Sequence, residues 1–138
     1  MIVKGIVFDF YDVLYDSSKH EINKDVLEIV KILKNKFKLY LFTNSSKEFL
    51  AFNDKQTQFL DLFLIHITTI DCNCHKPDEE SFKILFEETD IEPKDTIFID
   101  DKAENIKEAK KYGFNTIQYE DIKLLKDNLK RYNIDIGV

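Results

Sequence analysis

Short continuous apolar runs alternate along the chain with segments in which apolar residues are spaced as on one face of a helix. The continuous runs fill residues 4–9, 38–42, 64–70, 96–99 and 114–119, and each has the length of a buried strand. Helical spacing predicts helices over 22–36, 78–90 and 122–129, one starting near Ser45 or Ser46, a short helical segment over 54–63, and one through Ile106 and Ala109 that stops at Gly113. Alternating strands and helices predict an α/β fold, a three-layer α/β/α sandwich with a five-stranded parallel sheet covered on both faces.

Polar residues that carry chemistry follow four of the five predicted strands. They are Asp9, Tyr11 and Asp12 after the first, Thr43 and Asn44 after the second, Lys76 in the loop after the third, and Asp100, Asp101 and Asn105 after the fourth. Strands of a parallel sheet end at a common edge, where ligands bind in open α/β folds. We therefore expect these side chains to converge there.

The convergent set predicts phosphate chemistry. Asp9 together with Asp100 or Asp101 offers the hard oxygen ligands that Mg²⁺ prefers. A carboxylate beside such a metal can act as a nucleophile and form an aspartyl-phosphate. Thr43 can donate a hydrogen bond to a phosphoryl oxygen, and Lys76 can neutralise charge on the nucleophile and on the transferred group.

Four segments in this order resemble the motifs of the haloacid dehalogenase-like (HAD) hydrolase superfamily. They are Ile6-Val7-Phe8-Asp9-Phe10-Tyr11-Asp12-Val13-Leu14-Tyr15-Asp16, then Leu41-Phe42-Thr43-Asn44, then Lys76-Pro77-Asp78, and finally Ile97-Phe98-Ile99-Asp100-Asp101-Lys102-Ala103-Glu104-Asn105-Ile106. The resemblance runs from residue 4 to about residue 119. It implies a Rossmann-like sheet with strand order 3-2-1-4-5 and a single catalytic core domain over 1–138 without a substantial cap.

The same resemblance implies a role for each matching residue. Asp9 would be the nucleophile and a metal ligand, the backbone carbonyl of Tyr11 a second ligand, and Asp101 a direct ligand supported by Asp100. Thr43, Asn44 and Lys76 would contact the phosphate, with Lys76 bridging it to Asp9 and Tyr11 beside the substrate. Asn105 would assist from behind the ligands, and Asp12 is a further residue next to the site. The implied cofactor is Mg²⁺.

Tyr11 departs from the pattern of the phosphatase members. Those proteins carry an aspartate two residues after the nucleophile, followed by glycine, whereas this chain has Tyr11 and Asp12. The family's aspartate protonates the leaving oxygen and later activates water. A tyrosine, with an ordinary pKa of about 10, is a poor substitute at neutral pH, and losing a general acid costs about 10²–10⁴ in rate.

Three interpretations of Tyr11 stay open. Asp12 could take over the acid–base role, although the extra residue turns its side chain elsewhere. A haloacid dehalogenase also carries tyrosine at this place, but those enzymes use an arginine near the nucleophile, and the only arginine here is Arg131. The third interpretation, which we favour, keeps the phosphate site but weakens catalysis. The protein would then be a slow Mg²⁺-dependent phosphatase, or one limited to good leaving groups, with a HAD-fold binding or regulatory protein of weak or no turnover as the alternative.

The composition of the chain limits the classes of partner that we expect for it. The chain has 138 residues, 43% of them hydrophobic, and a net charge of −6 with 19 lysines and one arginine, which argues against a nucleic-acid-binding module. No apolar run reaches the length of a membrane span. We expect a phosphorylated small molecule or macromolecule as the partner, and an uncovered site leaves room for a homodimer.

The two cysteines favour a reducing, cytoplasmic setting. Cys72 and Cys74 lie two residues apart, and this spacing predicts that they do not form an ordinary structural disulfide. A metal site made by these cysteines and His75 is disfavoured, because structural zinc takes four ligands.

Overall fold

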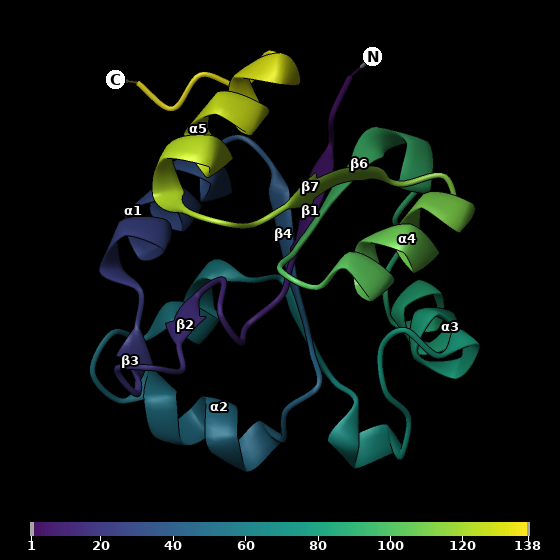
Figure 1. Cartoon of the computed structure of the whole chain (residues 1–138). Helices are drawn as coiled ribbons and strands as arrows, with labels where there is room; N and C mark the ends of the chain where they lie inside the picture. The colour runs from purple at the N-terminus through teal and green to yellow at the C-terminus, as the bar shows by residue number, and fades with distance from the viewer. Residues whose placement is uncertain (1, 138) are drawn as a thin grey trace.

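A five-stranded parallel sheet forms the centre of the computed structural model, which describes residues 2–137 (Figure 1). Its strands, in spatial order, are β5 (Ile65–Thr68), β4 (Lys38–Thr43), β1 (Gly5–Phe8), β6 (Thr96–Asp100) and β7 (Asn115–Gln118). Numbered along the chain, the five predicted strands therefore lie in the order 3-2-1-4-5, as the resemblance implied. The central strand β1 pairs with β4 on one side and β6 on the other.

Helices cover both faces of the sheet, which confirms the three-layer sandwich. One hydrophobic cluster joins the sheet to α1 (Lys24–Lys34), α2 (Lys47–Asp54) and α5 (Ile122–Arg131), and a second joins it to α3 (Glu79–Glu88) and α4 (Ala103–Lys111). Successive residues of a strand point to opposite faces. Thus Ile6 and Phe8 enter the first cluster and Val7 the second, which is why the strands are apolar without interruption.

Local capping sets the helix boundaries. The predicted helix over 22–36 begins only at Lys24, because the Asn23 side chain accepts hydrogen bonds from the backbone N–H groups of Asp25 and Val26. Ser46 caps α2 in the same way. After α4 the chain turns at Gly113, whose φ of 95° suits a residue without a side chain. Within residues 2–137, no helix has the length and apolar character needed to cross a membrane.

The sequence pattern did not reveal a small antiparallel hairpin beyond β1. It consists of β2 (Tyr15–Asp16) and β3 (Glu21–Ile22), two residues each. Segments this short hold too few alternations to produce a detectable period. The predicted helical segment over 54–63 reduces to the end of α2 and the 3₁₀ helix η1 (Phe59–Leu62).

The expectation for the cysteines was wrong, because the structure joins Cys72 and Cys74 in a disulfide. The 3₁₀ helix η2 (Ile70–Cys72) and the left-handed residue Asn73, with a φ of 55°, curl the chain sharply here. This turn places the two Cα atoms 5.5 Å apart, inside the ordinary range for a disulfide. Spacing along the sequence was therefore a poor guide to distance in this loop.

Phe82 tests the packing between the sheet and the second helical layer. Its buried ring lies against Phe42 and Phe98 of the sheet and stacks on Tyr112, with ring centres 5.1 to 5.6 Å away. We expect Phe82→Ala to lower the free energy of unfolding by about 3–5 kcal/mol, through lost burial and a cavity. Phe52 is 68% exposed, and Phe52→Ala should change stability by less than about 0.5 kcal/mol. Urea unfolding followed by circular dichroism measures both, and similar losses in the two variants would contradict this packing.

Candidate functional site

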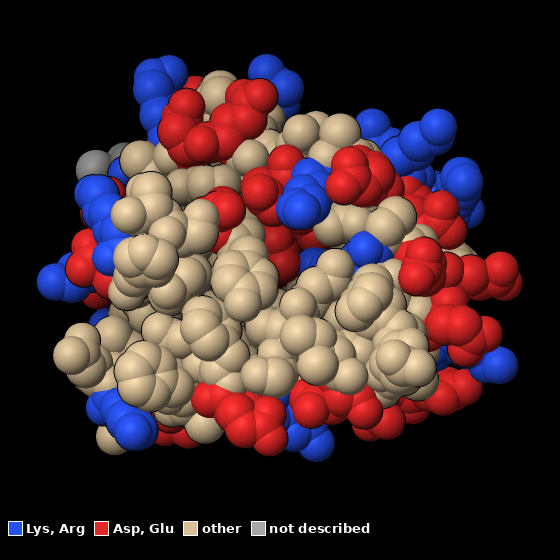
Figure 2. All heavy atoms as spheres, turned by 60° about the horizontal axis from the view of Figure 1, so that its bottom comes forward, with Lys and Arg blue, Asp and Glu red and all other residues tan. Residues whose placement is uncertain are grey.

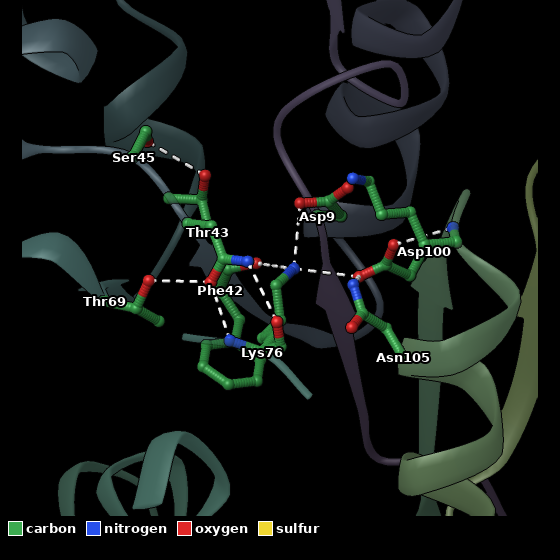
Figure 3. A network of polar contacts seen from close by, with 10 residues as sticks. Asp9, Phe42, Thr43, Ser45, Thr69, Lys76, Asp100 and Asn105 are labelled. Atoms are coloured by element: carbon green, nitrogen blue, oxygen red, sulfur yellow. Dashed lines mark hydrogen bonds and ion pairs between the residues drawn. The ribbon is translucent and has the colours of Figure 1, made fainter. Parts of the chain in front are cut away.

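The carboxyl ends of the central strands bring the predicted site residues together (Figure 3). Asp9 directly follows β1, Thr43 ends β4 and Asp100 ends β6. Lys76 lies in the loop between β5 and α3, and its side chain reaches across the sheet edge to the two aspartates. The expected convergence at this edge is therefore present.

The ammonium group of Lys76 is the centre of the network. It donates to Oδ1 of Asp9 at 2.9 Å, to Oδ2 of Asp100 at 2.8 Å and to the backbone carbonyl of Phe42 at 2.8 Å. These three acceptors use all three of its N–H donors. The Lys76 side chain is only 1% exposed, so this charge is held away from water and depends on these partners.

Asp100 is fixed from several sides. Its Oδ2 also accepts a hydrogen bond from the Asn105 amide at 3.2 Å, and its Oδ1 accepts one from the backbone N–H of Lys102 at 3.0 Å. The residue is fully buried. Charge-assisted hydrogen bonds of this kind hold a carboxylate in one orientation. Asn105 therefore helps to hold the Asp100 carboxylate in place.

Three carboxylates at this edge have the spacing of a cation site. Ligand oxygens of Asp9, Asp100 and Asp101 lie within 4.8 Å of one another. Among the described residues, the buried Oδ1 atoms of Asp101 and Asn105 have no hydrogen-bond partner. A buried polar atom without a partner is costly, and the one ammonium group beside these three carboxylates contacts only Asp9 and Asp100. The donor set therefore fits a hard divalent cation such as Mg²⁺.

Burial shapes the acidity of these groups. It raises the pKa of Asp9 to about 8, since desolvation and the nearby Asp100 charge outweigh the favourable effect of Lys76. Burial also raises the pKa of Asp101. For Lys76, burial alone would lower the pKa, but the Asp9 and Asp100 carboxylates more than compensate and raise it. One ammonium shared by two carboxylates keeps its proton, yet cannot neutralise both.

Asn44 holds the loop that carries Lys76. Its side-chain oxygen accepts hydrogen bonds from the Lys76 backbone N–H at 2.8 Å and from the Thr69 hydroxyl at 2.7 Å. Its amide group donates to the Lys76 carbonyl at 3.2 Å. The side chain expected to contact phosphate thus has a second task, because it fixes Lys76 on both sides of its Cα atom.

Thr43 lies beside Ser45 at the end of β4. The two hydroxyl oxygens are 2.9 Å apart and both residues are buried. Two hydroxyl groups have two protons to donate, and the hydrogen bond between them uses one. The pair therefore keeps one donor for another acceptor.

The structure places the side chains of Tyr11 and Asp12 in different surroundings. The half-buried Tyr11 ring stacks on Phe49 of α2, with ring centres 5.5 Å apart. Asp12 has a φ of 56°, a left-handed conformation that glycine or aspartate tolerates. Its exposed carboxylate accepts hydrogen bonds from the backbone and hydroxyl groups of Ser17, so the side chain is committed to the turn before β3.

Sequence reasoning missed one partner of Lys76 and one partner of Asn44. The Phe42 carbonyl has no side-chain signature, because any residue at that place in the strand offers the same acceptor. Thr69, which orients Asn44, lies directly after β5. A search of every hydroxyl residue at a strand end would have found it.

Comparison with known proteins assigns the family. The model of the haloacid dehalogenase-like hydrolases matches residues 18–113, more than half of the chain, so this protein belongs to that family of hydrolases. The matched segment includes Thr43, Lys76 and Asp100, and it begins after Asp9. No curated protein matches the chain by sequence.

Solved structures share the fold. A HAD-like family hydrolase from Porphyromonas gingivalis superposes with a TM-score of 0.77 at 16% identity, covering 95% of this chain and 99% of that one. A HAD family enzyme from Bacteroides thetaiotaomicron, solved with magnesium and inorganic phosphate, gives 0.65 at 28% identity over 73% of this chain and 56% of that one. The L-2-haloacid dehalogenase from Xanthobacter autotrophicus, solved with chloropropionic acid covalently bound, gives 0.72 at 13%, covering 94% and 83%. This chain thus spans about half the length of the Bacteroides enzyme.

Replacing Lys76 tests the network directly. We expect Lys76→Met to lower the free energy of unfolding by about 3–5 kcal/mol at neutral pH, because it leaves two buried carboxylates without their cation. Lys107→Met removes an exposed lysine from α4 and should change stability by less than about 0.5 kcal/mol. Urea unfolding with and without Mg²⁺ provides the measurement.

A double variant separates charge from packing. Adding Asp9→Asn to Lys76→Met removes one of the carboxylates that have lost their ammonium partner. The double variant should therefore be more stable than Lys76→Met alone. Additive losses would show that the two groups do not interact.

Proposed function

We propose that this HAD-family hydrolase is a Mg²⁺-dependent phosphatase that acts through an aspartyl-phosphate on Asp9. The observation that carries the proposal is the buried Lys76 ammonium, which contacts Asp9 and Asp100 beside a cluster of three carboxylates. Such an arrangement serves a reaction in which negative charge moves onto and off one carboxylate. The Bacteroides relative, solved with magnesium and inorganic phosphate, supports this choice.

Asp9, Asp101 and the backbone carbonyl of Tyr11 would hold the metal, with Asp100 orienting the site from behind. When bound, the ion would neutralise charge on the phosphoryl oxygens. Lys76 would stay close to Asp9 and stabilise the transferred group. The hydroxyl pair of Thr43 and Ser45 would donate its free proton to a phosphoryl oxygen, and Asn44 would keep the Lys76 loop in register with them.

In the proposed reaction, the Asp9 carboxylate attacks phosphorus and the bond to the leaving oxygen breaks. Water then attacks the phosphorus of the aspartyl-phosphate, which releases inorganic phosphate and restores Asp9. Both steps work best with a carboxylic acid near the leaving oxygen, and this chain has Tyr11 two residues after Asp9. We therefore propose slow turnover.

Tyr11 also favours a second candidate, a HAD-fold binding or regulatory protein without turnover. A dehalogenase is less well supported. The likeness to the Xanthobacter dehalogenase is at 13% identity and concerns the fold, while Arg131 is the last residue of α5.

We further propose that residues 1–138 form one core domain with an open site. Figure 2 turns the bottom of Figure 1 towards the viewer, and it shows acidic atoms inside a recess with uncharged side chains below it and charged side chains along its upper edge. A recess of this kind can admit a phosphorylated small molecule or a phosphate on a macromolecule. A second copy of the chain beside the recess is a further partner that this proposal allows.

Asp9→Asn tests the nucleophile. We expect the variant to lose hydrolysis of phenyl phosphate completely while keeping its fold, since an amide cannot form the phosphoenzyme. Asp127→Asn makes the same change at a half-exposed aspartate of α5, which pairs with Lys123, and should keep wild-type activity. Release of inorganic phosphate with Mg²⁺, and again with the metal chelated, provides the assay. Equal activity in the two variants, or activity unaffected by chelation, would contradict the mechanism.

Tyr11→Asp tests the missing acid. With the carboxyl group restored, we expect turnover of an alkyl phosphate such as ethyl phosphate to rise by about 10²–10⁴. Tyr11→Phe supplies no acid and should give no gain. If Tyr11→Asp is folded, binds Mg²⁺ and still gives no gain, the proposed reason for slow turnover is wrong.

A further inference from the structure

Tyr11 belongs to an aromatic cluster that runs from the core to the surface beside Asp9. Its ring stacks on Phe49 at 5.5 Å with an interplanar angle of 27°, and it meets the edge of Tyr15 at 5.9 Å. Phe10 and Tyr15 lie beneath in the core, with their rings stacked 5.1 Å apart. Tyr11 and Phe49 are only half-buried, so part of each ring stays accessible to a ligand.

Packing below fixes this pair in place. The fully buried Phe10 stacks on the fully buried Phe59 at 5.3 Å and meets Phe49 edge-on at 6.0 Å. Tyr11 therefore follows directly from a rigid core residue, and Asp9 precedes that residue. Aromatic pairs prefer offset-stacked or edge-to-face contacts with centres 4.5–7 Å apart, and the free parts of these rings can offer such contacts to a third ring.

The groups joined to Asp9 are badly placed to give a proton to a departing oxygen. All three protons of Lys76 have acceptors, and Asp9, Asp100 and Asp101 form the carboxylate cluster. Tyr11, two residues after Asp9, carries a phenol and no carboxylic acid. A leaving group in this site must therefore depart as a stable anion.

We propose that the substrate is a phosphate monoester of a phenol, whose ring packs on Tyr11 and Phe49. This inference rests on the phosphatase function proposed above and names its substrate class. The leaving group is then a phenolate, which is far more stable as an anion than an alkoxide. The aromatic pair and the missing proton donor are separate observations, and both select an aryl ester.

The only reactants of the proposed reaction are the phosphate ester, Asp9 and water. The Asp9 carboxylate forms a bond to phosphorus, and the phosphorus–oxygen bond to the ring breaks. Its electron pair leaves on the phenolate oxygen, which takes a proton from solvent. Water then attacks the phosphorus, the bond to Asp9 breaks, and inorganic phosphate leaves while one proton passes to solvent.

Four phosphate compounds separate ring binding from leaving-group stability. Phenyl phosphate has a ring and a stable leaving group, benzyl phosphate has only the ring, acetyl phosphate has only the stable leaving group, and ethyl phosphate has neither. With Mg²⁺, we expect the wild-type chain to hydrolyse phenyl and acetyl phosphate, with a lower KM for phenyl phosphate. Benzyl phosphate should inhibit competitively with little turnover, and ethyl phosphate should bind weakly and not react.

Phe49→Ala is the decisive variant. We expect it to raise the KM for phenyl phosphate and the inhibition constant of benzyl phosphate by about two- to tenfold, the usual range for one aromatic contact. The KM for acetyl phosphate should stay unchanged, which a merely structural defect would not allow. Phe52→Ala is the matched control, since it makes the same change in the same helix at a ring that faces the Lys55 ammonium group instead. Phe52→Ala should alter none of these three constants.

The outcomes are distinguishable. If none of the four compounds is hydrolysed, the phosphatase function fails and this inference fails with it. If acetyl phosphate is hydrolysed but phenyl phosphate shows no lower KM, or if Phe49→Ala affects both equally, only the aryl inference is overturned.

Two sources of an aryl phosphate can be separated in the same assay. A phosphotyrosine peptide used better than free phosphotyrosine indicates a protein substrate, and equal use of the two indicates a small aryl phosphate. Either result supports the inference, whereas failure of both together with phenyl phosphate overturns it.

Discussion

The ion pairs of Lys76 are the interaction on which the rest of the site depends. One ammonium group joins the ends of the three central strands, because it contacts Asp9 after β1, Asp100 at the end of β6 and the Phe42 carbonyl in β4. Burying a charge is expensive unless it is paired and hydrogen-bonded, and this lysine is both. The strands hold the two carboxylates and the carbonyl in fixed positions, and the lysine links these groups through its charge.

Without a bound cation, the negative charges of this cluster are not balanced. Two carboxylates share the lysine, a third lies beside them, and the Oδ1 atoms of Asp101 and Asn105 are buried without partners in the described part of the chain. Repulsion among acids at a sheet edge would favour another arrangement, unless an ion of opposite charge contributes to stability. Burial, and then the neighbouring Asp100 charge, raises the pKa of Asp9. Metal binding at this site would therefore be coupled to release of a proton from Asp9.

Strand positions and the convergence of the acids could be predicted from sequence because both follow from local patterns. Five uninterrupted apolar runs marked the strands, and the position of Asp9, Thr43 and Asp100 after those runs marked the edge where they meet. The family resemblance added the strand order, which hydrophobic pattern alone does not contain. The hairpin of β2 and β3 was not predicted, because strands of two residues are too short to show an alternating hydrophobic pattern.

The error over the cysteines and the remaining omissions depend either on the path of the chain through a loop or on a backbone group that every residue type offers. The Cys72–Cys74 disulfide forms because Asn73 adopts a left-handed conformation, which residue type alone does not specify. Asn44, expected to contact phosphate, has a further task that its residue type did not indicate, because it binds backbone groups of Lys76 and the Thr69 hydroxyl. The Phe42 carbonyl is an acceptor in any sequence. Sequence patterns do not specify the path of a loop or the contacts of backbone carbonyl groups.

The double hydrogen bond of Asn44 has a consequence for how the protein can change. Lys76 is carried by a loop, yet Asn44 fixes its N–H and C=O groups to the end of β4 as firmly as strand pairing would. The position of the ammonium group is thereby uncoupled from the exposed residues of the same loop, Asp71 to Asn73 and His75. Substitutions at these exposed positions can change the surface of the loop while the Lys76 ammonium group keeps its place. One short segment thus combines a fixed charge with a surface that is free to vary.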